Sequence, residues 1–447
     1  MRNCPIHQIA GALGVICEEK LQVTGYQIDS RRVGEGELFF ALRGAKVDGH
    51  SFLGEVKKRG GIGAVVDRGY EGPDFGLILF RVGDVGESLR GLARHFASQS
   101  KAQVIAVTGS VGKTTTKEFI GTLLSGKFRV GKTEGSYNTK LTLPITILNR
   151  TGLEDVWVLE MGMTEPGDIR RLLEIVVPDV AILTKIALAH VAAFAGGLAE
   201  IAREKAAIFT HPKTKKGIFY HGLNEYPEAV ALMGQEKVSF SLEDRSADYF
   251  LSFSEGKYLI DERGVRAYQF HLPFHQPHVL HNFLGAVSVA RQMKLEWDEI
   301  NQQIGQLQLP KMRFEQFEKE GVTFINDAYN ANPDSMRAAL TNLPEPKEGG
   351  KRIAVLATMV ELGSYSENSH REVGRLAHTF SDHLLAIGPE ALAYCEMFDE
   401  VKKPAEHFSD HESLTQRLKE LMCPGDVVLV KGSRRMQLEK IFEILGR

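Results

Sequence analysis

The sequence predicts an α/β protein of three domains, and three observations lead to this prediction. Short apolar runs of strand length alternate with helical segments along most of the 447 residues, as in parallel sheets joined by right-handed helical crossovers. A glycine-rich turn between such a strand and such a helix stands at Gly109–Gly112. The alternation restarts after Leu309 and Pro310. We therefore expect domains over residues 1–100, 101–309 and 310–447.

Each expected domain has strands of its own. The first carries short strands among glycine turns, at 37–42 and 62–66. The second begins at the glycine-rich turn and has the character of a mononucleotide-binding parallel sheet, with strands at 104–107, 156–159 and 180–183. The third is Rossmann-like in its alternation, with strands at 322–325, 353–356, 384–387 and 427–430.

The glycine-rich turn has the composition of a phosphate-binding loop, and its residues are Thr108, Gly109, Ser110, Val111, Gly112, Lys113, Thr114 and Thr115. Backbone N–H groups and the start of the following helix attract an anion, the lysine reaches the outer phosphates, and the first threonine after it can bind Mg²⁺. The two glycines stand three residues apart, closer than in the common Walker loop. The alternative is a fortuitous Gly-Ser turn, which the strand–turn–helix order disfavours.

Polar residues follow the predicted strands at the ends where ligands bind in open α/β sheets. Glu160 follows 156–159, and Thr184, Lys185 and then His190 follow 180–183. In the third part, Asp327 and Lys431 follow two further strands. A carboxylate on the strand after a phosphate loop usually holds Mg²⁺. Any one of these residues could be a solvent-exposed charge in a loop. That interpretation is a poor explanation for polar residues at the ends of four strands in two domains.

Composition excludes several classes of protein. The net charge is −3 with no long block of one sign, so we expect no nucleic-acid partner. Four cysteines without CxxC spacing fit a reducing cytosol. No apolar run is long enough to span a bilayer. The segment from Ile9 to Cys17 is too short and too glycine-rich for a signal peptide, and we expect a small helix there. Together these observations predict a cytoplasmic protein without membrane insertion.

Four histidines lie close together in the sequence, at His271, His275, His278 and His281. Zinc is one interpretation. The cluster contains no paired cysteines and is interrupted by prolines, so it matches no common structural zinc site. A loop leading into a helix at Asn282 explains these residues better.

A series of motifs makes the family recognisable. In the first domain they are Asp29-Ser30-Arg31-Arg32, Leu38 to Gly44, and Asp48-Gly49-His50-Ser51-Phe52. In the second they are Tyr137-Asn138 with Pro144, Leu159-Glu160-Met161-Gly162, Ala189-His190 with Phe194, and Glu204-Lys205-Ala206-Ala207-Ile208-Phe209. In the third they are Asp327-Ala328-Tyr329-Asn330-Ala331-Asn332-Pro333, Glu361-Leu362-Gly363 with His370, and Val430-Lys431-Gly432-Ser433-Arg434. With these motifs the chain resembles the Mur ligases over its whole length, and among them the branch that joins D-alanyl-D-alanine to UDP-N-acetylmuramoyl-tripeptide.

This resemblance implies an N-terminal α/β domain for the UDP-sugar substrate, a central ATP-binding domain and a C-terminal Rossmann-like ligase domain. It implies ATP and two Mg²⁺ ions, with a carbamylated Lys205. Lys113, His190 and Lys205 would be catalytic, and the metals would be held by Thr114, Glu160, His190 and Lys205. The nucleotide would be bound by the phosphate loop, Asn138, Asn282, Arg313 and Asp327. The two other substrates would be bound by Ser30, Arg31, Asp48, Gly49, His50, Tyr329, Asn330, Lys431, Ser433 and Arg434.

The chain departs from the family pattern at several positions near the expected nucleotide. Ser136, Thr139, Lys140 and Thr142 replace family residues before Pro144, and Val279 and Lys185 replace asparagines. The family's Gly-Asp-Met is Ala357-Thr358-Met359 here. None of these changes removes a phosphate-binding or metal-binding group.

The sequence therefore predicts a monomeric, ATP-dependent amide ligase that works through an acyl phosphate. Its substrates would be UDP-N-acetylmuramoyl-tripeptide and D-alanyl-D-alanine. One alternative is another ligase of the superfamily, which acts on a different amino acid or on folate. A second alternative is a nucleotide-dependent switch without ligase activity, which has no need for the Glu160, His190 and Lys205 set.

Overall fold

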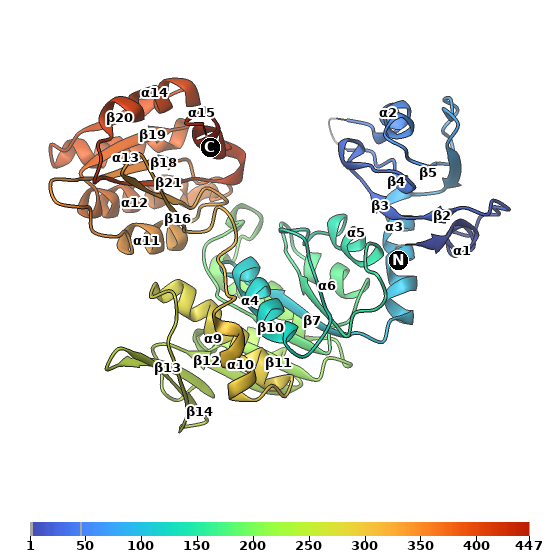
Figure 1. The fold of residues 1–447 in the computed structure, drawn as a ribbon, viewed down its shortest axis with the longest axis horizontal. Helices are drawn as coiled ribbons and strands as arrows, with labels where there is room; N and C mark the ends of the chain where they lie inside the picture. Colours follow the sequence, from blue (N-terminus) through green and yellow to red (C-terminus); the bar gives the residue numbers. More distant parts are fainter. Residues whose placement is uncertain (1–2, 45–46, 447) are drawn as a thin grey trace.

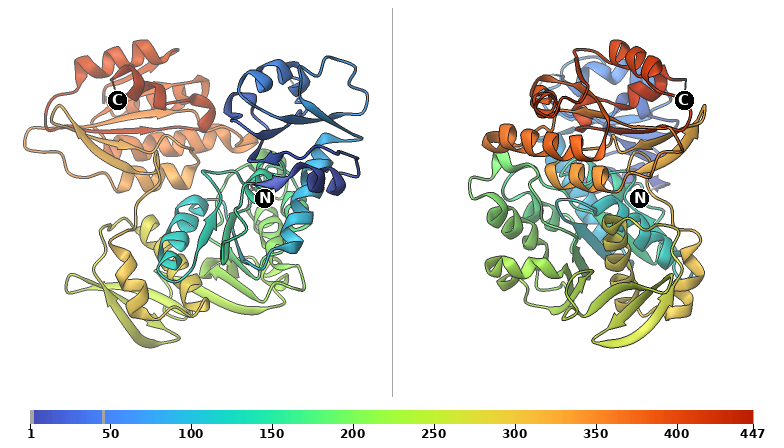
Figure 2. Two further views of the ribbon diagram at one scale, coloured as in Figure 1. Left: turned by 45° about the vertical axis from the view of Figure 1, so that its right-hand side comes forward. Right: turned by 90° about the vertical axis from the view of Figure 1, so that its left-hand side faces the viewer.

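The computed structural model describes residues 3–44 and 47–446, and its three larger sheets follow one another along the chain. Figure 1 shows the first part of the chain, in blue, and the last part, in orange and red, on either side of the top of the central part. Both views of Figure 2 again place the first and last parts above the central part. The α/β class expected from the alternation of strands and helices is confirmed.

The N-terminal part is built on a four-stranded parallel sheet. Its strands, in spatial order, are β3 (Gly25–Gln27), β4 (Glu37–Phe40), β5 (Gly63–Asp67) and β6 (Ile78–Val82). A small antiparallel pair, β1 (Cys4–Pro5) and β2 (Gln22–Val23), precedes it. The helices are α1 (Ile6–Ala12), α2 (Leu53–Lys58) and α3 (Val85–Gln99).

The helix expected from Ile9 to Cys17 begins and ends earlier than predicted. It is α1, which ends at Ala12, and Gly14 then adopts a φ of +70°. A left-handed glycine of this kind usually follows the end of a helix. The apolar residues beyond Gly14 therefore belong to an irregular segment.

The central part contains a nine-stranded sheet. Its strand order is β15-β14-β13-β12-β11-β10-β7-β9-β8. The parallel strands are β7 (Gln103–Thr108), β8 (Val130–Lys132), β9 (Val156–Glu160), β10 (Val180–Leu183), β11 (Lys216–Tyr220), β12 (Glu236–Ser241) and β13 (Tyr249–Ser254). The antiparallel edge is formed by β14 (Lys257–Glu262) and β15 (Val265–Phe270). The helices are α4 (Lys113–Ser125), α5 (Thr142–Leu148), α6 (Asp168–Leu173), α7 (Gly197–Ala206), α8 (Pro227–Ala231), α9 (Pro277–Gln292) and α10 (Trp297–Ile304).

Strand β7 lies in the interior of this sheet, and both of its faces are buried. Ile105 and Val107 belong to an apolar cluster shared with α4 and α9. Val104 and Ala106, which alternate with them, belong to a second cluster on the other face. A parallel strand covered on both faces needs a continuous apolar sequence, which explains the uninterrupted run at 104–107.

The C-terminal part has a six-stranded sheet with the order β16-β17-β21-β18-β19-β20. Its strands are β16 (Glu315–Lys319), β17 (Val322–Asn326), β21 (Val427–Lys431), β18 (Arg352–Ala357), β19 (His383–Ile387) and β20 (Ala405–Phe408), and only β16 runs antiparallel. The helices are α11 (Pro333–Thr341), α12 (Ser366–Phe380), α13 (Leu392–Glu400), α14 (His411–Leu421) and α15 (Glu439–Ile444). Parallel pairing of β17 with β21 brings the residues after both strands to one edge.

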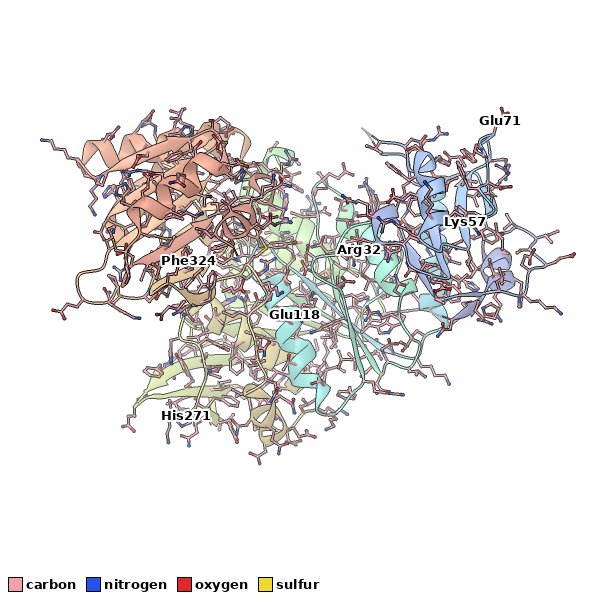
Figure 3. The ribbon with its side chains drawn as sticks, turned by 45° about the horizontal axis from the view of Figure 1, so that its top comes forward. Arg32, Lys57, Glu71, Glu118, His271 and Phe324 are labelled. Carbon is pink, nitrogen blue, oxygen red and sulfur yellow. The ribbon has the colours of Figure 1, made fainter. Side chains whose placement is uncertain are left out.

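The N-terminal part is attached to the central part by hydrogen bonds at Tyr26 and Arg32. The Asn149 amide, just after α5, accepts from the Tyr26 N–H at 3.1 Å and donates to the Tyr26 carbonyl at 2.9 Å. Arg32 donates to Glu134 at 2.8 Å and to the Tyr137 hydroxyl. Figure 3 shows Arg32 on the side of the N-terminal part that faces the central part, with Glu71 at the far edge.

Candidate active site

A cavity of about 690 Å³ lies between the central and C-terminal parts. From the central part its lining includes Ser110 to Thr115, Asn138, Glu160, His190 and Asn282. From the C-terminal part it includes Arg313, Asp327, Tyr329, Asn330, Lys431 and Arg434. Most residues predicted for the nucleotide and the metals therefore meet around one space, although they lie far apart in the sequence.

The phosphate loop has the backbone that the two glycines were expected to provide. Gly109 has a φ of +147° and Gly112 a φ of +86°, both in the region that glycine tolerates best. A side chain at Gly109 would collide with the Thr184 hydroxyl, and one at Gly112 would collide with the Asn282 amide. Close packing against β10 and α9 therefore excludes any larger residue at both positions.

Glu160 is the last residue of β9 and is 1% exposed. The Thr114 hydroxyl donates to its Oε2 at 2.9 Å, and the Asn138 amide donates to its Oε1 at 2.7 Å. The Arg313 guanidinium donates to the same Thr114 hydroxyl at 2.9 Å. The hydroxyl and carboxylate predicted to bind Mg²⁺ are thus in direct contact, and a residue of the C-terminal part reaches them.

Lys113 begins α4 and lies beside the phosphate loop. Its ammonium donates to the Gly109 carbonyl at 2.7 Å. Burial lowers the pKa of Lys113, and the nearby Arg313 lowers it further, whereas the Glu160 carboxylate opposes both effects. The ammonium of Lys113 therefore lies against the phosphate loop, where the sequence predicts that it meets the outer phosphates.

His190 makes contact with the C-terminal part. It has a φ of +58°, and its ring Nδ1 pairs with the carboxylate of Glu361, which has a φ of +67°. The N–H of Ala192 donates to the Glu361 carbonyl at 3.2 Å. The hydrogen bond with His190 lowers the pKa of the Glu361 carboxyl. The structure therefore places His190 in the cavity lining while one of its nitrogens pairs with a residue from another domain.

Lys205 is on α7 and is 1% exposed. Burial holds the pKa of its ammonium well below the usual range, and Lys113 lowers it further. Within residues 3–44 and 47–446, no hydrogen bond or ion pair engages its ammonium nitrogen, although Glu204 and Glu160 lie near enough to act on its charge. A buried lysine without a direct partner is unusual, because an unpaired buried charge is costly.

Asp327 and Lys431 stand at the adjacent ends of β17 and β21. The Lys431 ammonium contacts the Asp327 carboxylate at 2.5 Å and the Asn330 carbonyl at 3.0 Å. The other carboxylate oxygen accepts from the Phe314 N–H at 3.0 Å. The Arg313 guanidinium stacks on Tyr329 at 4.1 Å. The loop after β17 is therefore held by a buried ion pair at the edge of the cavity.

Two predicted substrate residues near the end of β21 have different surroundings. Ser433 is fully buried, and its hydroxyl accepts from the Val360 N–H at 2.9 Å, so it supports a neighbouring loop. Arg434 lines the cavity and pairs with Glu439 at 2.6 Å.

The predicted substrate residues of the N-terminal part do not line this cavity. Arg31 is exposed and forms a two-point contact with Asp29, while Ser30 beside it is buried. His50 is 6% exposed, its Nδ1 lies 2.6 Å from Asp48, and its Nε2 accepts from the Asp67 N–H at 3.0 Å. Both nitrogens of this histidine are therefore engaged within the N-terminal part.

Gly49 is also part of this compact turn. A side chain there would stand 2.7 Å from the Leu42 carbonyl. The turn around Asp48 and His50 therefore requires glycine at position 49 for packing.

Three of the four clustered histidines have separate partners, and the fourth, His271, is exposed. The ring of His275 lies 2.6 Å from the Tyr258 hydroxyl, and that of His278 packs against Phe314. His281 packs between Tyr220 and Phe240. Burial lowers the pKa of His278 to about 4 and that of His281 to about 3. Among the described residues, no group of three or more histidine, cysteine, aspartate or glutamate side chains is arranged to hold a metal ion.

Sequence reasoning missed several contacts around the site. The Ser136 hydroxyl pairs with the Tyr329 hydroxyl across the domain boundary. Lys185 approaches Asp334 to 3.9 Å, and its carbonyl accepts from the Ser110 N–H at 2.7 Å. Ser136 and Lys185 both lie next to recognised motifs in the sequence, but the sequence does not indicate which residues they contact.

Comparison with known proteins identifies the family. Residues 107–290, 312–434 and 22–70 match the domains described as "Mur ligase middle domain", "Mur ligase, glutamate ligase domain" and "Mur ligase family, catalytic domain". The UDP-N-acetylmuramoyl-tripeptide–D-alanyl-D-alanine ligase of Bacillus subtilis is 31% identical over 98% of this chain and 96% of that protein. The chain belongs to the Mur ligase family.

Solved structures resemble this Mur ligase over its whole length. MurF from Acinetobacter baumannii superposes with a TM-score of 0.84 at 28% identity and covers 98% of both chains. MurF from Thermotoga maritima, solved in complex with ADP, has a TM-score of 0.78 at 30% identity, over 94% of this chain and 96% of that one. The expected three-domain Mur ligase architecture is therefore confirmed. Within the described part of this Mur ligase, no helix is long and apolar enough to cross a membrane.

Proposed function

We propose that this Mur ligase joins D-alanyl-D-alanine to UDP-N-acetylmuramoyl-tripeptide, with ATP as the energy source, in the synthesis of peptidoglycan precursors. The observation that carries this proposal is the cavity in which Lys113, Thr114 and Glu160 of the central part meet Arg313 and Tyr329 of the C-terminal part. The relatives that match over nearly the whole chain bear the name of this activity.

The reaction needs a leaving group on the substrate carboxylate. A carboxylate oxygen attacks the γ-phosphorus of ATP, the bond to the β-phosphate oxygen breaks, and ADP leaves. The amine of D-alanyl-D-alanine then attacks the acyl phosphate carbon, phosphate leaves, and the amine loses a proton. Positioning and charge neutralisation dominate such phosphoryl transfers. The phosphate loop and Lys113 would hold the γ-phosphate in line with the carboxylate.

The residues predicted to hold magnesium fit a hard cation. Thr114 and Glu160 offer a hydroxyl and a carboxylate in direct contact, and Mg²⁺ prefers such oxygen ligands. Bound Mg²⁺ would neutralise charge on the phosphate oxygens. A second ion would be held by His190 and by a carbamate on Lys205. The ammonium of Lys205 is buried, has no hydrogen-bond or ion-pair partner among the described residues, and has a lowered pKa, which supports a neutral amine that can take up CO₂.

The other predicted site residues would bind the three substrates in different domains. The domains are residues 1–100, 101–309 and 310–447. Asn138, Asn282, Arg313 and Asp327 would complete the nucleotide site around the phosphate loop. The N-terminal domain would hold the UDP-sugar through Ser30, Arg31, Asp48, Gly49 and His50. The C-terminal domain would hold the dipeptide through Tyr329, Asn330, Lys431, Ser433 and Arg434. Closure of the C-terminal domain would exclude water, which would otherwise hydrolyse the acyl phosphate.

We infer that the enzyme works as a monomer in the cytoplasm, where ATP and UDP-linked precursors are found, with no nucleic-acid partner. The free state of all four cysteines supports a reducing compartment.

Phosphate release from ATP tests the function when each acceptor is offered alone and both together. We expect ADP, phosphate and the pentapeptide product only when UDP-N-acetylmuramoyl-tripeptide and D-alanyl-D-alanine are both present. Equal phosphate release without the dipeptide would indicate a simple nucleotide hydrolase or switch. Product formation with a different amino acid or with folate, but not with D-alanyl-D-alanine, would indicate another ligase of the superfamily.

A further inference from the structure

Lys117 is a fully buried lysine on α4, and the function described so far gives it no part. Its ammonium donates to the carbonyls of Thr133 and Gly135, at 2.6 Å in each case. It also lies 3.0 Å from the carboxylate of Glu118. Figure 3 labels Glu118 on this helix. The ammonium of Lys117 therefore ties the phosphate-loop helix to the turn that follows β8.

That turn holds Glu160 at two points. The Thr133 hydroxyl accepts from the Glu160 N–H at 2.9 Å. The Asn138 amide donates to the Glu160 carboxylate at 2.7 Å, and the Asn138 carbonyl accepts from the Gly162 N–H at 2.8 Å. Residues 133–138 thus fix the backbone of Glu160 as well as the direction of its carboxylate.

The same turn is where the other two domains reach the central one. Arg32 of the N-terminal part contacts Glu134 and Tyr137, and Tyr329 of the C-terminal part contacts Ser136. Contacts with both neighbouring domains therefore converge on the segment that orients Glu160. The bonds from Lys117 connect the same segment to α4 within the central part.

Energetics support a positioning role for Lys117. Burying an ammonium is costly unless hydrogen bonds and an opposite charge compensate for the lost water. An apolar residue of similar length would fill the same volume without that cost. The ammonium, however, has three N–H donors, and it binds two backbone carbonyls of the turn while it pairs with Glu118. These bonds fix the path of the main chain whatever side chains stand at 133 and 135.

We propose that Lys117 is a positioning residue for the magnesium-dependent chemistry. It holds residues 133–138 so that Thr133 and Asn138 keep the Glu160 carboxylate directed at the Thr114 hydroxyl. The inference rests on the proposed function, because it takes Glu160 as a magnesium ligand. Lys117 does not line the cavity, so it acts through its neighbours and not on the substrates.

The test compares ADP binding in EDTA with ADP binding over a range of Mg²⁺ concentrations, by calorimetry. In Lys117→Met we expect nearly unchanged ADP affinity in EDTA. The Mg²⁺ concentration needed for the half-maximal effect should rise about 10- to 100-fold, as for other residues that support metal ligands. In turnover, kcat should fall while the KM for the UDP-linked substrate stays the same. An equal loss of ADP affinity in EDTA would mean that Lys117 supports the whole phosphate loop, which contradicts the proposal.

Lys132→Met is the matched control. Lys132 pairs with the same carboxylate of Glu118 but has no bond to the carbonyls of Thr133 or Gly135. We expect the wild-type response to Mg²⁺ in this variant. A similar defect in Lys132→Met would assign the effect to the charge of Glu118 and overturn the role of Lys117.

Thr133→Val provides a second route if Lys117→Met does not fold. It exchanges a hydroxyl for a methyl group of similar size and removes the acceptor of the Glu160 N–H. We expect the same rise in the Mg²⁺ requirement. A wild-type Mg²⁺ requirement in a folded Thr133→Val or Lys117→Met protein would contradict the inference about Lys117 but not the proposed function. If ADP binding by the wild-type protein itself does not respond to Mg²⁺, the magnesium site of the proposed function fails instead.

Discussion

The guanidinium of Arg313 donates a hydrogen bond to the Thr114 hydroxyl at 2.9 Å, although the two residues belong to different domains. The Thr114 hydroxyl in turn donates a hydrogen bond to the Glu160 carboxylate, and the Arg313 guanidinium stacks on the ring of Tyr329. Ser136 then pairs with Tyr329. The C-terminal domain therefore contacts the hydroxyl that is predicted to bind Mg²⁺.

Replacing Arg313 should weaken nucleotide binding. Arg313→Ala removes a charge-assisted donor at the phosphate loop, so we expect the KM for ATP to rise about tenfold. Steady-state kinetics at saturating concentrations of the other substrates measures this change. Lys311→Ala, an exposed neighbour, is the control and should behave as wild type. An unchanged KM for ATP in Arg313→Ala would remove this residue from the nucleotide site.

Replacing Lys113 should remove turnover and leave the fold intact. We expect its ammonium to bind the outer phosphates of ATP, so Lys113→Ala should lower kcat by about 100-fold or more. The thermal unfolding midpoint of the apo protein should barely change, because strand β7 and helix α4 keep their packing. Lys140→Ala serves as the control, since Lys140 lines the same cavity but pairs with Glu165. Near-normal turnover in Lys113→Ala would mean that the phosphate site lies elsewhere.

Replacing Asp327 should affect stability as well as nucleotide binding. Asp327→Ala leaves the buried ammonium of Lys431 without its carboxylate, which costs about 3 kcal/mol. We expect a lower unfolding midpoint and a higher KM for ATP. In the double variant with Lys431→Met, stability should largely return while the KM for ATP stays high. If the double variant restores both, Asp327 has a structural role and does not bind the nucleotide.

Carbamylation of Lys205 should make activity depend on CO₂. A carbamate forms from the neutral amine and is lost as the pH falls, so removing CO₂ at mildly acidic pH should lower activity and bicarbonate should restore it. Lys205→Ala should be nearly inactive and partly rescued by acetate, which can occupy the vacated position. Full activity of Lys205→Ala in CO₂-free buffer without added acid would refute the carbamate.

His281 should make the protein less stable in acid. Burial lowers its pKa in the folded state to about 3, from an ordinary value of 6.5. As the pH falls below 6.5, His281 becomes protonated in the unfolded chain but stays neutral in the folded chain. The free energy of unfolding therefore falls by about 2 kcal/mol by pH 5. Urea unfolding at several pH values should show a flatter pH dependence for His281→Leu than for wild type. The exposed His271→Gln is the control, and an equal slope in His281→Leu would contradict the prediction.

The sequence predicts a site best where the residues that form it follow one another directly along the chain. The strand, turn and helix around Gly109 and Lys113 follow one another directly, so the phosphate loop was readable from the residues alone. The ends of the strands were nearly correct, although Glu160 and Lys431 prove to be the last residues of β9 and β21. Helix α4 begins at Lys113, because the glycine-rich loop leads directly into it.

The contacts that join the domains could not be predicted from the sequence. Ser136 meets Tyr329 almost two hundred positions along the chain, and neither residue carries a local signal for the other. The burial of His50 is a similar case, because its second nitrogen accepts from the backbone N–H of Asp67, the last residue of β5. Such pairings depend on how sheets and domains pack, which no spacing of residues encodes.

The cavity is lined by residues of two domains, so an inhibitor can bind one domain alone or both domains together. A compound that binds only the phosphate loop would compete with ATP but would not hold the C-terminal domain in place. A compound that also binds the loop after β17, near Tyr329, would link the two domains. Its residence time would then be limited by the separation of two domains, a slower event than the release of a single contact.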